Sequence, residues 1–451
     1  MKKKTAQSWH ERRDCLPETG WEAGEIRRVL GAAKGDDADW QNGRIWSLVY
    51  YGGESHADFL IEAFDLYAAE NALSPTAFPS VRRFERDIVS MLRTLLRGGA
   101  NVVGTMTSGG TESILLAVKT YRDRARRRNP SNRRLDMILP ASAHPAFLKA
   151  AQYFDVTPVV VPVRDDLGAD PDSMAQHITE RTIMLAASAP CFPYGVVDPV
   201  AELGTVAAKH NIGLHVDACL GGLMLPFLRR LGKPVPDFDF VVPGVTSISV
   251  DLHKYGYALK GASANLYRSV ELRRHQFFVE TEWAAGLFGS AGMLGTRSGG
   301  IIAAAWAGMM RLGEAGYLDL ARRTSDLTER LQAGIASIPG LRIVGRPDMT
   351  VFAFTADGPD IFAIADRMAD KGWHLDRQVR PDSIHLVVTP QHEAVVDEFL
   401  RDLAAATRDV AARGEQSLAG SSTLYGVTAA VSDTADPRSA VIAAMEKTLD
   451  E

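Results

Sequence analysis

The stretch Ser249-Val-Asp-Leu-His-Lys254-Tyr-Gly-Tyr-Ala-Leu-Lys260-Gly decides how the rest of this chain is interpreted. Its first residues are typical of the end of a short buried strand, and the loop that follows crowds Lys254 between a histidine and two tyrosines. Such a neighbourhood is unusual for a solvated surface lysine. A lysine becomes a nucleophile toward carbonyl groups when its surroundings lower its pKa. We therefore expect a lowered pKa and a chemical role for Lys254.

A second strand end lies upstream, where Leu214-His-Val-Asp217-Ala is typical of a buried strand that ends in a carboxylate. An alternative role for Asp217 is a helix N-cap, but the residues after it are poor at opening a regular helix. A buried carboxylate needs a partner, because an unpaired buried charge is costly. A strand-end Asp and a loop Lys together indicate a site for pyridoxal 5′-phosphate (PLP). Lys254 would form the Schiff base, and Asp217 would pair with the pyridinium nitrogen.

Two further motifs support a PLP site. Gly109, Gly110 and Thr111 stand just before a helical run, where backbone N–H groups at a helix start can hold a phosphate. A helix cap without a ligand is the alternative interpretation of this turn. His144 follows a predicted strand, at the edge where open α/β sheets place ligands, and its imidazole could stack on a flat ring. A packed structural histidine is the alternative there.

Short apolar runs alternate with helical stretches from about residue 101 to 270. This alternation predicts an α/β fold with a mainly parallel central sheet that is covered on both faces. After a long helix over 301–335, a smaller α+β domain is expected. The predicted domains are an N-terminal helical segment (1–100), a large PLP-binding domain (101–310), a small C-terminal domain (311–413) and a tail (414–451), of which Gly414–Ser422 is rich in Gly and Ser. The predicted strands of the large domain are Leu135–Leu139, Thr157–Val163, Thr182–Ala187, Ile212–Asp217, Ser247–Asp251 and Ala264–Tyr267.

Composition excludes several classes of protein. With 46% apolar residues, 23% charged residues and a net charge of −5, the chain is typical of a globular protein and gives no support to a nucleic-acid role. Three cysteines at unrelated spacings argue against a disulfide framework or a cysteine metal site, so we predict no metal. Neither a secretory signal nor an apolar run of membrane-spanning length is found, which favours a cytoplasmic protein.

One charged segment falls outside the predicted site. The segment Arg122–Arg134 carries seven arginines. A solvated helix end and loop is the favoured interpretation of this segment. Contact with an anionic surface is the alternative.

The motifs resemble those of the PLP-dependent sphingosine-1-phosphate lyases, within the fold-type I, group II decarboxylase-like enzymes. The resemblance extends over nearly the whole chain, from about Gly43 to the region of Tyr425. The stretches that end at Gly222 and Gly261 are the most specific to the lyase branch. The resemblance is carried by Gly109–Ser113, Ser142–His144, His215–Gly222, Asp251–Gly261, Phe192–Pro199, Phe277–Trp283, Gly295–Gly300 and Lys371–Trp373.

The resemblance implies a role for each matching residue of the cofactor site. Lys254 would be the Schiff-base lysine, Asp217 would pair with the pyridine nitrogen, and His144 would stack on the ring. The cofactor phosphate would be held by the glycine turn together with His253. Thr296 would complete the cofactor contacts, from a segment that reaches the neighbouring subunit's site, which implies an obligate homodimer.

The resemblance also implies a substrate, which is a phosphorylated sphingoid base such as sphingosine 1-phosphate. Tyr50, Tyr194 and Lys260 match positions associated with substrate binding or proton transfer, and Asn71 belongs to the same set. Ser74 departs from the pattern, because the lyases carry a histidine near the substrate head group at this position. Serine lacks the reach and the titratable charge of histidine. The eukaryotic lyases also carry a membrane span that this sequence lacks, so it resembles a soluble bacterial form.

The implied reaction is a retro-aldol cleavage to a long-chain aldehyde and phosphoethanolamine. An amino-acid decarboxylase is the alternative, because it uses the same Lys, Asp and His to break a bond to a carboxylate instead. A lipid-phosphate-binding scaffold without activity is a third hypothesis, which the intact set of Lys254, Asp217 and His144 disfavours. The sequence leaves open which residue is the general base.

Overall fold

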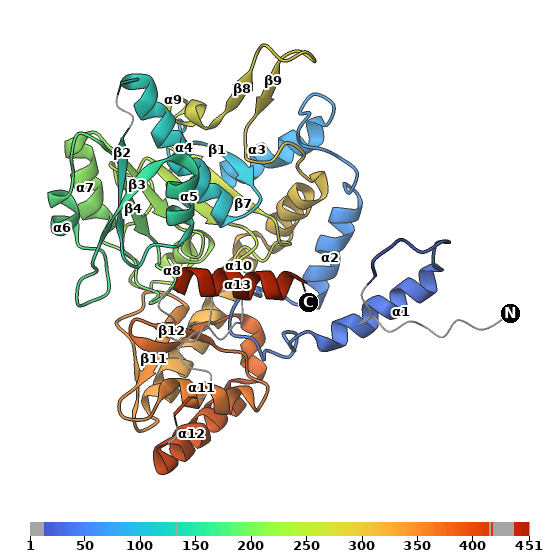
Figure 1. The fold of residues 1–451 in the computed structure, drawn as a ribbon, viewed down its shortest axis with the longest axis vertical. Coiled ribbons are helices and arrows are strands. Elements are labelled where there is room, and N and C mark those ends of the chain that lie inside the picture. The colour runs from blue at the N-terminus through green and yellow to red at the C-terminus, as the bar shows by residue number, and fades with distance from the viewer. Residues whose placement is uncertain (1–12, 132–133, 415, 418–436, 451) are drawn as a thin grey trace.

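The computed structural model describes residues 13–131, 134–414, 416–417 and 437–450. Most of the predicted Gly/Ser-rich tail therefore lies outside the described residues. A large α/β lobe occupies one end of the molecule and a smaller lobe the other, and the long helix α10 (Gly299–Ala336) runs between them (Figure 1). The predicted boundary at residue 310 falls inside α10. The domain boundaries stay a prediction.

Seven strands form the large sheet in the order β1-β7-β6-β5-β4-β2-β3. Within this sheet β7 runs antiparallel to both of its neighbours, and the other adjacent pairs are parallel. This confirms the mainly parallel sheet. The strands are β1 (Val103–Thr107), β2 (Leu135–Pro140), β3 (Val156–Val161), β4 (Thr182–Ser188), β5 (Gly213–Asp217), β6 (Ser247–Asp251) and β7 (Ser263–Tyr267).

Helices cover both faces of this sheet, which is why its central strands are buried throughout. Successive side chains alternate between the faces, so that Met137 packs in one apolar cluster and Ile138 in the other. The helices are α4 (Gly110–Arg128) and α5 (Ala146–Phe154) on the first face. The second face has α3 (Pro79–Leu95), α7 (Val200–His210), α8 (Leu225–Arg230) and the first part of α10.

The small lobe is an antiparallel sheet with two helices, α11 (Ile361–Ala369) and α12 (Val396–Arg413). Its core includes Trp46 from the N-terminal segment, whose indole stacks on His392 with ring centroids 4.0 Å apart. The helix that follows, α2 (Glu54–Asp65), contacts α10. The strands of this sheet are β10 (Leu341–Ile343), β11 (Val351–Ala356), β12 (Asp376–Val379) and β13 (Asp382–Val387).

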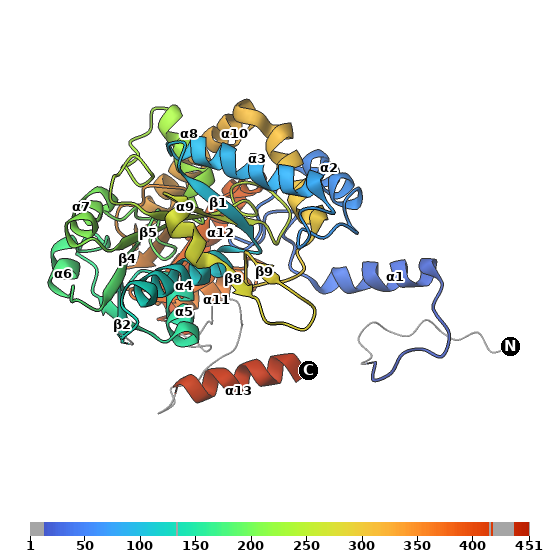
Figure 2. The same ribbon diagram turned by 90° about the horizontal axis from the view of Figure 1, so that it is seen from above.

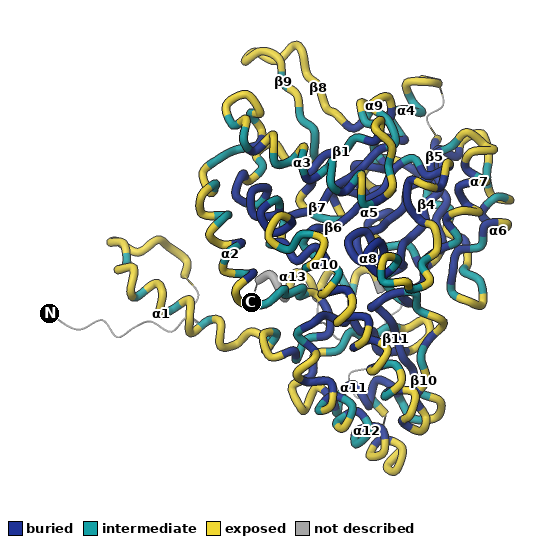
Figure 3. Tube along the Cα trace, turned by 180° about the vertical axis from the view of Figure 1, so that it is seen from behind, coloured by how far each residue is buried: buried dark blue, intermediate teal, exposed yellow. Residues whose placement is uncertain are grey.

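Several segments stand away from the two lobes. The hairpin of β8 (Phe278–Glu280) and β9 (Phe288–Ser290) projects from the large lobe (Figures 1 and 3). Helices α1 (Ala23–Ala33) and α13 (Pro437–Asp450) lie outside both sheets (Figure 2), and α1 has no buried residue. No helix in the described part of the chain combines the length and apolar character that crossing a membrane requires.

Candidate active site

The candidate site lies at the carboxyl ends of the large sheet's parallel strands. Asp217 ends β5 and Asp251 ends the neighbouring strand β6. Thr107 ends β1 at the same edge, and the glycine turn follows it directly. Open α/β sheets bind their ligands at this edge, because the loops that leave the strands converge there. The fold therefore brings the glycine turn, both carboxylates and the Lys254 loop to one place.

Lys254 is held by a carboxylate whose importance the sequence left open. Its Nζ lies 3.0 Å from Oδ2 of Asp251, a residue that is only 1% exposed. Burial disfavours the ammonium, but the combined influence of Asp251, Cys219, Tyr50 and Asp217, with Asp251 the strongest of these, raises the pKa of Lys254 well above its usual value. The expectation of a lowered pKa was therefore wrong for the protein without its cofactor. Without the cofactor, Lys254 is held as an ammonium group in an ion pair with Asp251.

The imidazole of His253 is fixed by the backbone. The N–H groups of Gly261 and Ala262 both donate to its Nδ1, at 3.2 and 3.1 Å. A neutral ring that accepts at Nδ1 carries its proton on Nε2, and Nε2 lies 3.6 Å from the Asp251 carboxylate. Burial lowers the pKa of His253, and Asp251 offsets this only in part. The ring is thereby held with its N–H toward the site.

Asp217 and His144 lie near each other, and each accepts a hydrogen bond from a backbone N–H group two residues further along the chain. Oδ1 of Asp217 accepts hydrogen bonds from the Cys219 N–H at 3.1 Å and the Ser249 hydroxyl at 3.4 Å. Nδ1 of His144 accepts from the N–H of Ala146 at 3.1 Å. Burial lowers the pKa of His144, although the charge of Asp217 acts in the opposite direction. His144 is thus a neutral ring at neutral pH.

The backbone at Gly110 packs too closely against its neighbours to allow a side chain. A Cβ on Gly110 would lie 2.8 Å from Sγ of Cys219 and 2.9 Å from Oδ2 of Asp251, which is closer than real Cβ atoms come. A Cβ on Gly109 would lie 3.4 Å from Cε1 of His253. Thr111 is exposed in the first turn of α4. The start of α4 is therefore bare backbone beside Asp251, Cys219 and His253.

Lys260 and Tyr50 are neighbours on the other side of Lys254. Nζ of Lys260 donates to the carbonyl of Leu48 at 2.6 Å and lies 5.2 Å from the centre of the Tyr50 ring. Tyr50 packs edge-on against Tyr255, with ring centroids 5.0 Å apart. Although the side chain of Lys260 reaches solvent, burial of its Nζ and repulsion from Lys254 lower its pKa to about 8.

Tyr194 and His144 line a cavity of about 360 Å³ between the large lobe and β12 of the small lobe. The hydroxyl of Tyr194 donates to the carbonyl of Arg380 in that lobe. Burial raises the pKa of Tyr194. This tyrosine is therefore a poor base while its hydroxyl is engaged with the backbone.

Asn71, Ser74 and Thr296 form a second group. Nδ2 of Asn71 donates to the Thr296 hydroxyl at 3.2 Å, and the Ser74 N–H donates to the Asn71 carbonyl at 3.2 Å. Within the described ranges, none of these three side chains shares a hydrogen bond with Lys254 or Lys260. The structure thus places the predicted residues in two groups. One surrounds Lys254, and the second consists of Asn71, Ser74 and Thr296.

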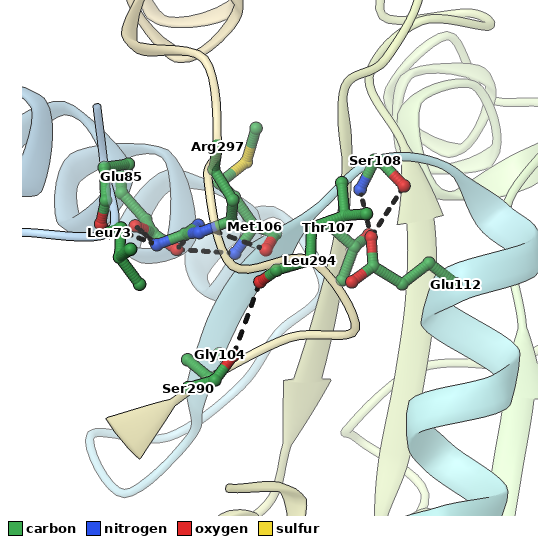
Figure 4. A network of polar contacts seen from close by, with 12 residues as sticks. Leu73, Glu85, Gly104, Met106, Thr107, Ser108, Glu112, Ser290, Leu294 and Arg297 are labelled. Atoms are coloured by element: carbon green, nitrogen blue, oxygen red, sulfur yellow. Dashed lines mark hydrogen bonds and ion pairs between the residues drawn. The ribbon is translucent and has the colours of Figure 1, made fainter. Parts of the chain in front are cut away.

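An ion pair that the sequence analysis missed joins this second group to the glycine turn. Arg297 donates to both oxygens of the Glu85 carboxylate at 3.0 and 3.1 Å, and Glu85 accepts the N–H of Met106 at 2.9 Å (Figure 4). Met106 lies in β1, just before the turn. The N–H of Arg297 donates to Asn71. Arg297 therefore ties three segments together through its guanidinium and its backbone N–H. The Gly295–Gly300 stretch contains this residue, but the sequence does not show its partner.

Glu112 makes a second connection that the sequence analysis missed. Its Oε2 accepts from the N–H and the hydroxyl of Ser108, both at 2.7 Å (Figure 4). Its Oε1 accepts from the N–H of Met293 at 2.7 Å. This carboxylate therefore links the start of α4 to the loop that carries Thr296. The sequence signals for it are its place in the Gly109–Ser113 stretch and in the first turn of a predicted helix, and neither signal shows its partners.

Comparison with known proteins identifies the family. The profile of the pyridoxal-dependent decarboxylase conserved domain matches residues 39–357. The chain is 45% identical over 417 residues to a protein of Arabidopsis thaliana named sphingosine-1-phosphate lyase. The aligned region covers 91% of this chain and 76% of the relative. The chain belongs to the sphingosine-1-phosphate lyase family.

Solved structures agree with this family. A Burkholderia pseudomallei sphingosine-1-phosphate lyase superposes with a TM-score of 0.86 at 40% identity, over 90% of this chain and 95% of that one. A Lactobacillus brevis glutamate decarboxylase superposes with a TM-score of 0.78 at 20% identity, over 89% and 96% of the two chains. The second comparison shows the shared fold-type I architecture alone.

The residues of this lyase-family chain suit the cofactor that the family implies. Apart from the ion pair with Lys254, the buried carboxylate oxygens of Asp251 accept no hydrogen bond from the described residues. Both hydrogen bonds donated to Asp217 end at Oδ1, so Oδ2 keeps its capacity to accept one. Bare backbone at Gly110 and a half-buried, neutral His144 complete a set of donors, acceptors and ring surface suited to PLP.

Proposed function

We propose that this protein is a PLP-dependent carbon–carbon lyase that cleaves phosphorylated sphingoid bases, such as sphingosine 1-phosphate, to a long-chain aldehyde and phosphoethanolamine. The observation that carries the proposal is family membership over nearly the whole chain, together with Lys254, Asp217 and His144 at one edge of the sheet. PLP, when bound, supplies the sink for the electrons of the broken bond.

The protein's own residues decide which bond breaks by binding and orienting. Lys254 would carry the cofactor, and Asp217 would hold a proton on the pyridine nitrogen. The start of α4 at Gly109, Gly110 and Thr111, with the Nε2–H of His253, would bind the cofactor phosphate. Because Asp251 raises the pKa of Lys254, the amine would have to leave this ion pair and lose its proton before it could react.

The substrate would be bound and deprotonated by residues around Lys260. Its ammonium, still largely protonated at neutral pH, would meet the substrate phosphate as a point charge. A base must take the proton of the 3-hydroxyl while the bond between the amine-bearing and hydroxyl-bearing carbons breaks, and the amine-bearing carbon then receives a proton. Tyr50, beside Lys260, is the better placed phenol, because the Tyr194 hydroxyl is engaged with the backbone. Lys254 is the other candidate.

A homodimer with shared sites is the second part of the proposal. Helix α1 has 11 residues and none is buried, although isolated helices of that length are marginal in water. The β8–β9 hairpin exposes Val279, Trp283 and Leu287, and an apolar cavity of about 310 Å³ lies between this hairpin and Leu73. A second copy that covers these surfaces would bring Asn71, Ser74 and Thr296 to a neighbouring Lys254.

The proposal is tested by incubating the purified protein with PLP and sphingosine 1-phosphate. Release of a long-chain aldehyde with phosphoethanolamine is expected. Release of carbon dioxide from amino acids, with no aldehyde from the lipid, would establish the decarboxylase alternative instead. The same preparation should be yellow, and Lys254→Ala should remove the absorption band. A wild-type protein that stays colourless with added PLP would leave only the scaffold hypothesis.

A cytoplasmic location is also proposed, supported by three cysteines that are all free thiols in the structure.

Size-exclusion chromatography with light scattering tests the dimer. A monomer with full lyase activity would refute the shared site.

A further inference from the structure

A strongly basic cavity lies on the opposite edge of the large sheet from the Lys254 site. It has a volume of about 450 Å³ and is formed by the end of α4, the start of β6 and the segment after β7, which includes α9 (Val270–Arg273). Helices α4 and α9 lie side by side, far from the small lobe (Figures 1 and 3). We call it the basic cavity and define it by Arg124, Arg127, Arg128, Arg268, Arg274 and His275.

The basic cavity is separate from the candidate active site. Thr246, on its wall, precedes β6, and Asp251 ends that strand. A strand of this length spans about 16 Å, at roughly 3.3 Å per residue. A ligand in the basic cavity would therefore not contact the cofactor or the substrate of the lyase reaction.

Among the residues that the structure describes, no carboxylate lies within ion-pair distance of the arginines of the basic cavity. In the described part of the chain, Arg124, Arg127, Arg128 and Arg274 form no ion pair within 4.0 Å, and one acid, Glu271, lines the cavity. Arg268 donates to three backbone carbonyls.

Other arginines of the same helix behave differently. Arg122 pairs with Asp123 and Arg126 pairs with Asp155. Unpaired guanidinium groups are therefore a property of the basic cavity and not of the whole arginine-rich segment.

The positive charges repel one another in a partly buried place. Burial and then the charge of Arg128 lower the pKa of Arg124, and burial followed by Arg127 and Arg124 lowers that of His275. Cations at a helix C-terminus stabilise the helix dipole, which accounts for Arg127 and Arg128. It does not account for the cations that the segment after β7 brings to the same cavity. A bound anion would relieve this repulsion.

We propose that the basic cavity is a binding site for a phosphate-bearing ligand. Guanidinium groups recognise phosphate oxygens in pairs, and several of them converge here from two segments. The volume lies in the range of small-molecule sites, which is about 300–1,000 Å³. The chemistry recognised is the phosphate group, whether it belongs to a free phosphorylated compound or to a phospholipid head group. The site does not depend on the lyase reaction.

The test uses the PLP-loaded protein, so that the cofactor phosphate site is filled. Pyrophosphate binding is measured by calorimetry, and lipid binding by co-sedimentation with phosphatidylcholine vesicles with and without phosphatidate. The double variant Arg127→Gln/Arg274→Gln removes two exposed cations of the basic cavity and should weaken binding by about tenfold or more. The matched double variant Arg122→Gln/Arg126→Gln, on the same helix but outside the cavity, should bind like wild type.

Each outcome decides the proposal. Pyrophosphate binding that the cavity variant loses supports a site for a free phosphorylated compound. Phosphatidate-dependent sedimentation that the cavity variant loses supports a lipid head group. The proposal is overturned if neither probe binds, or if the cavity variant and the matched variant bind alike. Lys260→Met serves as a further control, because pyrophosphate held in the substrate site would be lost in that variant only.

Discussion

The ion pair between Glu85 and Arg297 should stabilise the region around the glycine turn by a measurable amount. The two side chains are 17% and 16% exposed and meet at 3.0 and 3.1 Å. Breaking a buried pair costs about 3–5 kcal/mol. Glu85→Gln keeps an oxygen for the Met106 N–H and for one guanidinium N–H, so we expect a smaller loss of about 1–2 kcal/mol. Glu85→Ala also leaves the Met106 N–H without an acceptor, which brings the expected loss to about 3 kcal/mol.

Hydrogen exchange at the Met106 amide measures this loss where it acts, and urea unfolding followed by circular dichroism gives the global value. Arg297→Met is combined with Glu85→Gln, and the coupling energy of the cycle should be about 1 kcal/mol or more. Arg83→Gln, which removes an exposed partner of Asp87 on the same helix, is the control and should change stability by less than about 0.5 kcal/mol. Strictly additive effects of the two substitutions would refute the idea that this pair ties the segments together.

Three further outcomes are expected. Gly110→Ala should lower stability by about 1–3 kcal/mol through overpacking and should reduce PLP retention, both followed by thermal melting and absorbance. Gly109→Ala, whose added carbon meets one ring atom at 3.4 Å, should be milder, and equal effects would contradict the geometry. Substrate binding should weaken as the pH rises through about 8, because Lys260 then loses the charge that attracts phosphate. Lys260→Arg should move this limb of the kcat/KM profile to higher pH, and an unmoved limb would assign it to another group. Ser74→His should raise lyase turnover if a titratable group is wanted at that position, and an unchanged or lower rate would count against that interpretation.

Local patterns predicted the central part of the fold, because buried parallel strands appear as short apolar runs. The strand ends at Asp217 and Asp251 were found in this way. Strand β12 was missed because its first three residues are polar and half-exposed and its fourth, Val379, is exposed. Strand β1 was missed because it mixes Gly and Thr with apolar residues.

Contacts between distant positions could not be predicted from the sequence. Arg297 and Glu85 are separated by 212 positions, and although Arg297 belongs to the Gly295–Gly300 stretch, nothing in the sequence pairs it with Glu85. The pKa of Lys254 was predicted in the wrong direction, because the sign of its shift depends on how closely the side chain approaches charged groups, such as Asp251 at 3.0 Å, and residue order alone does not give that distance. The sequence therefore predicted which residue types form the candidate site. It did not predict properties that depend on distances between side chains, such as ion pairs and pKa shifts.

The N-terminal segment also constrains how the two lobes can move. Trp46 is anchored in the core of the small lobe, and α2 is packed on α10. The connecting residues 47–53 carry Tyr50, and Lys260 of the large lobe donates to Leu48 within them. Any hinge opening between the lobes must therefore displace Tyr50 from Lys260. The distance between these two side chains therefore depends on how far the lobes are closed, and a fluorescent or NMR label at Tyr50 would measure that change.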